Sequence, residues 1–224
     1  LKALTSCLPK ILFVLFYIKN ATFSTFNQNF NIYSAPGATY LLGYLNNMNF
    51  MYNGQANLGQ DGIFVYGLNS SITLGTNAQV NSSETSVIGV FVDGIYPSSS
   101  YEVLNHGSLQ LLGYSSTGIY AENGARVLND ADGSIETGDN SVGIYGLNSG
   151  DINNFGEISI GETSTGIYSE SAGFVNNTGS ITSQLPNAVG IYSKVSSGIT
   201  NDLSGVINLS GNESIGIYNI GTTS

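Results

Sequence analysis

The sequence predicts an all-β protein, a parallel β-helix (solenoid) with about 25 residues per coil and three short strands per coil. Two sequence motifs recur at one common period from residue 62 onward, and a chance repeat cannot explain both. Each period holds three short apolar stretches separated by Gly, Asn, Ser and Asp. Glycine accounts for 29 of 224 residues and charged residues for only 9%, which disfavours a helical bundle.

The first element of each coil is a Gly-Ile-Tyr motif. Well-formed copies lie at 118–120, 143–145, 166–168, 190–192 and 216–218, and degenerate copies are Gly62-Ile63-Phe64 and Gly89-Val90-Phe91. Their starts are 23 to 29 residues apart. Because side chains alternate along a strand, Val142 and Ile144 are expected to face inward, which turns Gly143 and Tyr145 to the other face.

The second element is a block that contains asparagine and glycine, such as Val127-Leu128-Asn129 followed by Gly133-Ser134-Ile135. It predicts a column of stacked asparagines at a turn, bonded to backbone or to one another. The expected members are Asn105, Asn129, Asn153, Asn176 and Asn201, spaced 23 to 25 residues apart. Asn177 is expected to lie outside the column.

The repeats predict a β-helical array over residues 62–224, with about seven coils, which we expect to be truncated at the C-terminus. Residues 1–61 form a poorly patterned N-terminal segment. Its apolar run at 11–18 is too short to cross a bilayer, which takes ~20 residues. That run is either an export signal or an end strand or cap of the array.

The charge distribution excludes one class of partner. The net charge is −10, and all 15 acidic residues lie in 61–224 beside only Arg126 and Lys194. A nucleic-acid-binding surface needs clustered Lys and Arg, so we expect no nucleic-acid partner.

Candidate catalytic groups are few. Asp130 and Asp132 resemble the paired carboxylates of glycoside hydrolysis, and His106 lies one coil earlier. All three fall in turns between apolar stretches, where solvated polar residues are common. Arg126 and Lys194 are about three coils apart and cannot converge on one substrate. We therefore expect a protein that is not an enzyme and has no catalytic residues.

No pattern for a metal or cofactor is present. Cys7 has no His nearby in sequence, and there is no Cys/His cluster of the kind that binds zinc. No nucleotide-binding glycine motif follows a strand and opens a helix. We expect no metal site and no cofactor.

The tyrosines of the repeated motif are the candidate binding residues. They are Tyr120, Tyr145, Tyr168, Tyr192 and Tyr218. If they point outward, they form an aromatic strip that can receive sugar rings or a partner surface. The alternative is that stacked tyrosines only stabilise the rod, or face inward.

The iterated Gly-Ile-Tyr followed by Asn-Asn-x-Gly-x-Ile, over about residues 62–224, resembles the passenger region of bacterial type V secreted autotransporters, in the style of fusobacterial adhesin-like outer-membrane proteins. The resemblance implies a location at the cell surface, in the outer membrane or outside the cell. It also implies membrane attachment only through a C-terminal β-barrel outside this fragment.

The function that the resemblance implies is a non-catalytic stalk or adhesin, whose partner is a host-cell surface protein or glycan. The alternative is a carbohydrate-active β-helix, similar to a polysaccharide lyase or hydrolase, with its catalytic coils outside this fragment.

Overall fold

The computed structural model describes residues 12–19, 24–26, 30–32, 39–59, 61–96, 99–195 and 198–221, with side chains described from residue 43 onward. Within these ranges the secondary structure is strands, bends and turns. No described segment forms a helix long and apolar enough to cross a membrane. The predicted parallel β-solenoid with three strands per coil is confirmed.

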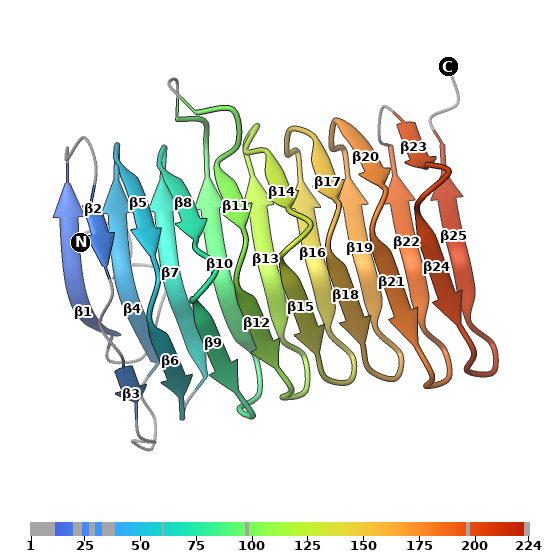
Figure 1. Cartoon of the computed structure of the whole chain (residues 1–224), viewed down its shortest axis with the longest axis horizontal. Helices are drawn as coiled ribbons and strands as arrows, with labels where there is room; N and C mark the ends of the chain where they lie inside the picture. The colour runs from blue at the N-terminus through green and yellow to red at the C-terminus, as the bar shows by residue number, and fades with distance from the viewer. Residues whose placement is uncertain are drawn as a thin grey trace.

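Three parallel sheets run along the rod, and the chain contributes to each in turn (Figure 1). Sheet A contains β1 (Leu12–Lys19), β4 (Thr39–Asn46), β7 (Gly62–Leu68), β10 (Val87–Asp93), β13 (Thr117–Glu122), β16 (Val142–Leu147), β19 (Thr165–Glu170), β22 (Val189–Lys194) and β25 (Ile215–Ile220). Sheet B contains β2 (Ser24–Phe26), β5 (Asn49–Tyr52), β8 (Ser71–Leu74), β11 (Val103–Asn105), β14 (Val127–Asn129), β17 (Ile152–Asn154), β20 (Phe174–Asn177) and β23 (Gly198–Asn201). Sheet C contains β3 (Phe30–Ile32), β6 (Gln55–Leu58), β9 (Gln79–Ser82), β12 (Ser108–Leu111), β15 (Ser134–Thr137), β18 (Glu157–Ile160), β21 (Ser180–Ser183) and β24 (Val206–Leu209).

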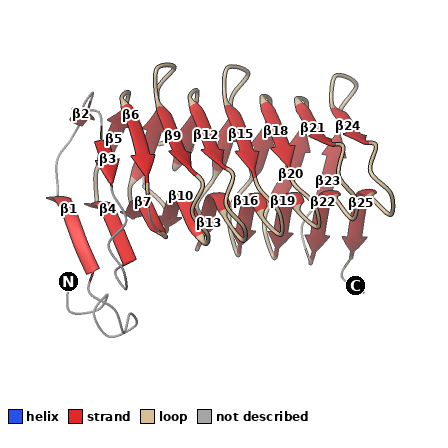
Figure 2. Ribbon diagram, turned by 90° about the horizontal axis from the view of Figure 1, so that it is seen from below, coloured by secondary structure: helices blue, strands red, loops and turns tan. Residues whose placement is uncertain are grey.

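Strands that pair by hydrogen bonds are three elements apart in the chain, as in β13–β16–β19, and all pairs are parallel. The chain therefore passes through sheets A, B and C and returns to sheet A one coil further on. Figure 2 shows the result as a row of repeated layers, with sheet C along one side and sheet A along the other. Residues 62–221 supply seven strands of sheet A, which matches the predicted number of coils.

The pairing also reaches into the segment that the sequence left without a pattern. β1 pairs with β4 from Leu12↔Thr39 to Lys19↔Asn46, so the apolar run at 11–18 overlaps the end strand of sheet A. β4, β5 and β6 continue into β7, β8 and β9 in the same order. A role of this run in export stays a prediction, and Cys7 lies outside the described residues.

One degenerate repeat has a register different from the expected one. β7 aligns with β10 through Val65↔Val90 and Tyr66↔Phe91, so the motif there is Phe64-Val65-Tyr66 and not Gly62-Ile63-Phe64. Phe64 is buried, and its ring packs edge-on against Tyr52 with centroids 4.9 Å apart. The apolar–aromatic pair determines this register, because it places one side chain inside and the next outside.

The interior is filled by columns of aliphatic side chains that repeat from coil to coil. Sheet A contributes Ile119, Ile144, Ile167 and Ile191, sheet B contributes Val103, Val127, Ile152 and Val175, and sheet C contributes Leu109, Ile135, Ile158 and Ile181. All are at most 1% exposed. Burial of these columns is the main favourable contribution to the stability of the rod.

The motif glycine faces the interior, contrary to the expected alternation. A Cβ on Gly143 would lie 2.7 Å from Cγ2 of Ile158 and 2.6 Å from the carbonyl oxygen of Gly166. The paired positions are Val142↔Thr165 and then Ile144↔Ile167, and the glycine between them is skipped. The prediction that Val142 shares the inward face of Ile144 is therefore wrong, and Val142 is only half-buried. Glycine is required here because any side chain would collide with the core.

A ladder of hydrogen-bonded asparagines runs along sheet B. Its members are Asn105, Asn129, Asn154, Asn177 and Asn201. In each pair Nδ2 of one residue donates to Oδ1 of the next at 2.7 Å. The first four are fully buried. The ladder thus satisfies amide groups that burial would otherwise make costly.

Two predicted members, Asn153 and Asn176, do not belong to this ladder. Both are half-buried and lie one residue before the true members. The register is set by the buried aliphatic residue of each strand, as in Val127↔Ile152, and the ladder asparagine lies two residues after it. Aligning the Asn-Asn pairs by their first residue placed the column on the wrong face of the strand.

One connection between sheets A and B is longer than the others. The connection at 94–102 joins β10 to β11, and the structure describes 94–96 and 99–102 of it. Its base is fixed by Glu102, a fully buried carboxylate that accepts from Arg126 at 2.9 Å (Nη2) and 3.1 Å (Nε). Arg126 Nη2 also donates to the carbonyl of Ser99 at 2.6 Å. The bidentate geometry satisfies a charge that would otherwise be costly to bury.

Candidate functional site

A continuous ladder of eight aromatic rings follows the outer face of sheet A. Its members are Tyr44, Tyr66, Phe91, Tyr120, Tyr145, Tyr168, Tyr192 and Tyr218. Neighbouring ring centroids are 4.6 to 5.4 Å apart. Every member occupies the same register position, as in Tyr120↔Tyr145↔Tyr168. We refer to these eight residues as the aromatic ladder.

The sequence identified the five C-terminal members of the aromatic ladder but not the three N-terminal ones. Phe91 stands in a recognised degenerate repeat, so its place was available from the motif. Tyr66 was missed because the repeat around Gly62 was aligned two residues too early. Tyr44 follows Gly43 in the segment without a pattern, and no signal in the motif identifies it.

The rings lie on the outside of the rod. Tyr145 is half-buried between the fully buried Ile144 and the buried Gly146, as alternation along β16 requires. From Tyr120 to Tyr192 the rings are parallel within 2° to 8° at 4.8 to 4.9 Å. Each inner ring of this stack is therefore covered on both faces by its neighbours. The stack presents ring edges and hydroxyl groups to solvent, and its faces are not open to a ligand.

Two pairs of charged side chains lie beside the aromatic ladder, two residues further along their strands, and Leu147 separates the two pairs. Asp93 lies next to Glu122, and Glu170 lies next to Lys194. The Tyr66 hydroxyl donates to Oδ2 of Asp93 at 3.1 Å, and Lys194 Nζ lies 2.7 Å from Oε1 of Glu170. The edge of the ladder is therefore polar as well as aromatic.

The surroundings of three neighbouring ladder tyrosines raise the pKa of their phenols. Burial, followed by the nearby Glu122 carboxylate, raises the pKa of Tyr120 to about 12. Burial also raises the pKa of Tyr145 and of Tyr168. Burial and the adjacent Asp93 raise the pKa of Glu122, while a hydrogen bond from Tyr120 opposes that shift. At neutral pH the row of hydroxyls is uncharged and can both donate and accept hydrogen bonds.

The candidate catalytic residues lie at the turns that join sheet B to sheet C within a coil. His106 Nδ1 is 3.1 Å from Oδ2 of Asp130 in the next coil, and Oδ1 of Asp130 accepts from the backbone N–H of Ala131. Asp132 is exposed. Among the basic residues, Arg126 is engaged by Glu102 and Lys194 by Glu170. These contacts give His106 and Asp130 a role in holding the turn.

The part of the chain with described side chains contains no group of three His, Cys, Asp or Glu residues that could hold a metal ion. Two other acidic residues near Asp130 and Asp132 in sequence, Asp139 and Asp151, accept hydrogen bonds from backbone N–H groups. Oδ1 of Asp139 accepts from the N–H of Glu162, and Oδ1 of Asp151 accepts from that of Phe174, both at 2.8 Å. Each of these carboxylates links one coil to the next.

Comparison with known proteins found no relative of this chain. No protein-family model, curated protein or solved structure matches the chain. The chain is therefore identified by its architecture alone, as a parallel β-solenoid with three strands per coil.

Proposed function

We propose that this chain is a non-catalytic segment of a secreted or surface-displayed bacterial rod, of the autotransporter-passenger kind, that acts as a stalk or an adhesin. The observation that supports the proposal is the unbroken register of two side-chain ladders, aromatic on sheet A and asparagine on sheet B. The resemblance of the repeats to autotransporter passengers adds the bacterial surface as the expected location.

The ladders suit a rod that must not bend. In a solenoid each coil contacts only its neighbours, so stiffness depends on the contacts between adjacent coils. The nine strands of sheet A span roughly 40 Å at ~4.8 Å per step. Stacked rings and Asn–Asn hydrogen bonds add directional contacts at successive steps, beyond the pairing of the backbone. A spacer that holds a binding surface away from a cell benefits from that stiffness.

The charges favour some partners over others. The chain carries a net charge of −10, and Arg126 and Lys194 are both paired with glutamates. Such a surface repels anionic polymers and suits neutral glycans or the apolar patches of a host protein. Nucleic acid stays an unfavourable partner on the same argument.

The proposal is tested by the attachment of coated beads to epithelial cells. Beads that carry the full chain should bind in excess of beads that carry the same mass of heat-denatured chain. Equal attachment of both preparations would remove the adhesin role. Single-molecule stretching then tests the stalk role, and we expect the coils to resist unfolding under force. Coils that open at forces typical of flexible loops would contradict that role.

The alternative is a carbohydrate-active β-helix with its catalytic coils outside this fragment. The observation that favours it is an elongated groove on sheet C, lined by residues of β15, β18, β21 and β24. We expect the purified chain to release neither reducing ends nor unsaturated products from pectin, alginate or glycosaminoglycans, and release of either would overturn the non-catalytic proposal.

A further inference from the structure

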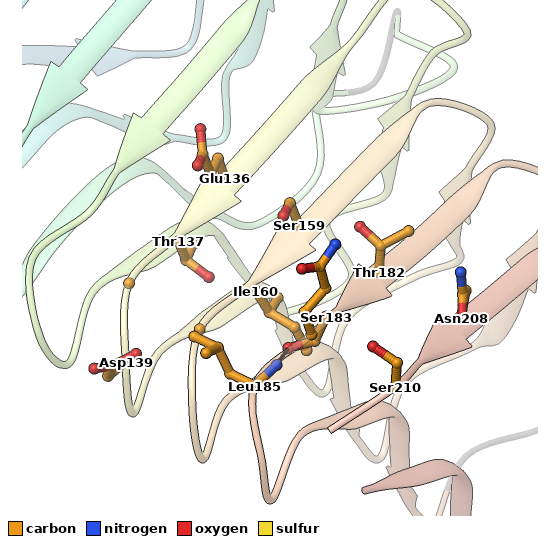
Figure 3. Close-up of a pocket in the computed structure, with 13 residues that line it drawn as sticks. Glu136, Thr137, Asp139, Ser159, Ile160, Thr182, Ser183, Leu185, Asn208 and Ser210 are labelled. Carbon is orange, nitrogen blue, oxygen red and sulfur yellow. Dashed lines mark hydrogen bonds between the residues drawn. The ribbon is translucent and has the colours of Figure 1, made fainter. Parts of the chain in front are cut away.

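A groove lies where the strands of sheet C end and the chain turns toward sheet A. It encloses about 580 Å³ and extends over β15, β18, β21 and β24 (Figure 3). Figure 3 shows Glu136, Ser159, Thr182 and Asn208 one after another on these neighbouring strands. Their backbone positions are direct register partners, so the groove repeats one polar position at each coil.

The groove is associated with two short side chains in the middle of this row, Ser159 and Thr182. Earlier in the same row, Asn81 donates to Asn57 at 3.1 Å, and Gln110 donates to Oε2 of Glu136 at 2.8 Å. These long side chains cover the sheet and pair with one another. Ser159 and Thr182 are too short to continue this pairing.

The polar groups of the groove are available to a ligand. Within the described part of the chain, the side chains of Ser159, Thr182 and Asn208 make no hydrogen bond. Hydroxyl and amide groups both donate and accept, as the hydroxyl groups of a sugar do. Their spacing of ~4.8 Å per coil is comparable to the length of one sugar residue along a glycan chain.

From this we infer that the groove is a binding site for an extended glycan chain without negative charge, laid along the axis of the rod. The inference concerns a face other than the aromatic ladder and does not depend on the proposed function. Glu136 and Asp139 line the groove, whereas Arg126 and Lys194 do not. The groove therefore disfavours anionic polymers and accepts neutral or amino sugars.

The edges of the groove supply apolar contacts for sugar rings. Leu185, on one wall, is 45% exposed. A smaller hollow of about 170 Å³ adjoins the groove through Asp139 and is lined by Tyr114, which is 57% exposed. Tyr114 is not a member of the aromatic ladder, so its ring is free to stack on a sugar.

A bound peptide fits this groove less well than a glycan. Extended peptides commonly bind by adding a strand to the edge of a sheet. Three of the four floor strands, β15, β18 and β21, have both edges paired, whereas β24 is the end strand of sheet C and pairs only with β21. Over β15, β18 and β21 the floor thus offers side chains and no unpaired backbone groups, which is the chemistry that a hydroxyl-rich ligand needs.

The test measures calorimetric binding of three tetrasaccharides to the full chain: chitotetraose, its deacetylated form and tetragalacturonate. We expect at least one of the first two to bind and tetragalacturonate not to bind. The double variant Ser159→Gln/Thr182→Gln should weaken that binding about tenfold or more by filling the groove. Glutamine is tolerated in this row, since Gln110 occupies it two coils before Ser159.

Ser180→Gln is the matched control, because Ser180 lies on the same strand as Thr182 and outside the groove. It should leave affinity unchanged, and Tyr114→Ser should lower it. The inference is overturned if neither the neutral nor the amino tetrasaccharide binds, if tetragalacturonate binds best, or if the double variant binds as the parent does. Saturable binding of a lysine-rich peptide in place of the sugars would also overturn it. Both groove variants leave the aromatic ladder intact, so bead attachment to cells reports on the proposed function separately.

Discussion

The side-chain amide of Asn154 donates to Oδ1 of Asn177 at 2.7 Å, and both side chains are fully buried. Asn177 in turn donates to Asn201 at the same distance. An amide in the middle of this chain of bonds is both donor and acceptor. Removing one therefore affects two neighbours at once.

Asn177→Ala is expected to lower the free energy of unfolding by about 2–3 kcal/mol, because it leaves buried polar groups of the adjacent coils without their partner. Asn176→Ala is expected to change it by no more than about 0.5 kcal/mol, because Asn176 is half-buried and makes no side-chain hydrogen bond in the described part of the chain. Urea denaturation of the two variants measures the difference. A larger loss of stability for Asn176→Ala than for Asn177→Ala would favour the column predicted from the sequence, which contains Asn176.

How far the sequence predicts the asparagine ladder depends on which residues of the repeats are aligned with one another. The period, the three strands per coil and the presence of an asparagine column all follow from the repeats. The choice between Asn153 and Asn154 does not, because the two are adjacent and identical in type. Ile152 resolves it, because the residue two positions after a buried aliphatic side chain points inward as well. Alignment by the core residue, not by the commonest polar one, predicts the observed ladder.

The orientation of the motif glycine could not be predicted from the sequence, for a different reason. Simple alternation predicts one inward side chain in every two, and the strands of sheet A bury both Gly143 and Ile144. The interruption depends on a close approach between coils, which no single strand encodes. The same holds for the groove on sheet C. It is associated with the length difference between Gln110 and Ser159 in register across coils, and is visible only once the strands are stacked.

Gly143→Ala is expected to destabilise the chain by about 3 kcal/mol or more, because its Cβ would lie within 2.7 Å of both Ile158 and the backbone of Gly166. Val142→Ala removes a half-buried side chain and should cost about 1 kcal/mol. Thermal and urea midpoints of the two variants provide the measurement. The opposite order would mean that Val142, and not the glycine, faces the core.

Thr137→Val is expected to stabilise the chain by about 1 kcal/mol. The Thr137 hydroxyl is buried without a hydrogen-bond partner, and the residues paired with it are Leu111 and Ile160. Replacing the hydroxyl by a methyl group of similar size removes an unsatisfied polar atom from an apolar row. Thr165→Val, at a half-buried position between Val142 and Val189, should change stability by less than about 0.5 kcal/mol. A loss of stability in Thr137→Val would show that the hydroxyl has a partner such as water.

Alkaline pH is expected to destabilise the fold. The pKa of Tyr120 rises from 10.0 to about 12 on folding, and those of Tyr145 and Tyr168 rise as well. Because the unfolded chain loses these protons first, the stability they contribute is complete below pH 10 and falls as the pH approaches 12. Stability measured across this range should decline less steeply in Tyr120→Phe than in the parent. Phenols that titrate near pH 10 while the β-sheet circular dichroism spectrum persists would contradict a half-buried ladder.

The final prediction concerns what the aromatic ladder contributes to adhesion. Replacing Tyr145, Tyr168 and Tyr192 together by serine should reduce bead attachment to cells to the level of denatured chain, with the β-sheet spectrum retained. Each lost ring contact costs about 0.5–1.5 kcal/mol of stability, so the comparison is made well below the thermal midpoint.

Replacing the same three residues by phenylalanine separates the contribution of the hydroxyls from that of the rings. The rings stay stacked in this variant and only the hydroxyls are lost. The stack offers edges and hydroxyls to a partner, so we expect the phenylalanine variant to lose adhesion as well. If it adheres as the parent does, the ring edges alone make the contact. If the serine variant also adheres fully, the ladder is a scaffold that stiffens the rod, and the adhesive surface lies on another face. A serine variant that fails to fold, beside a phenylalanine variant that folds and adheres, would assign the ladder to stability.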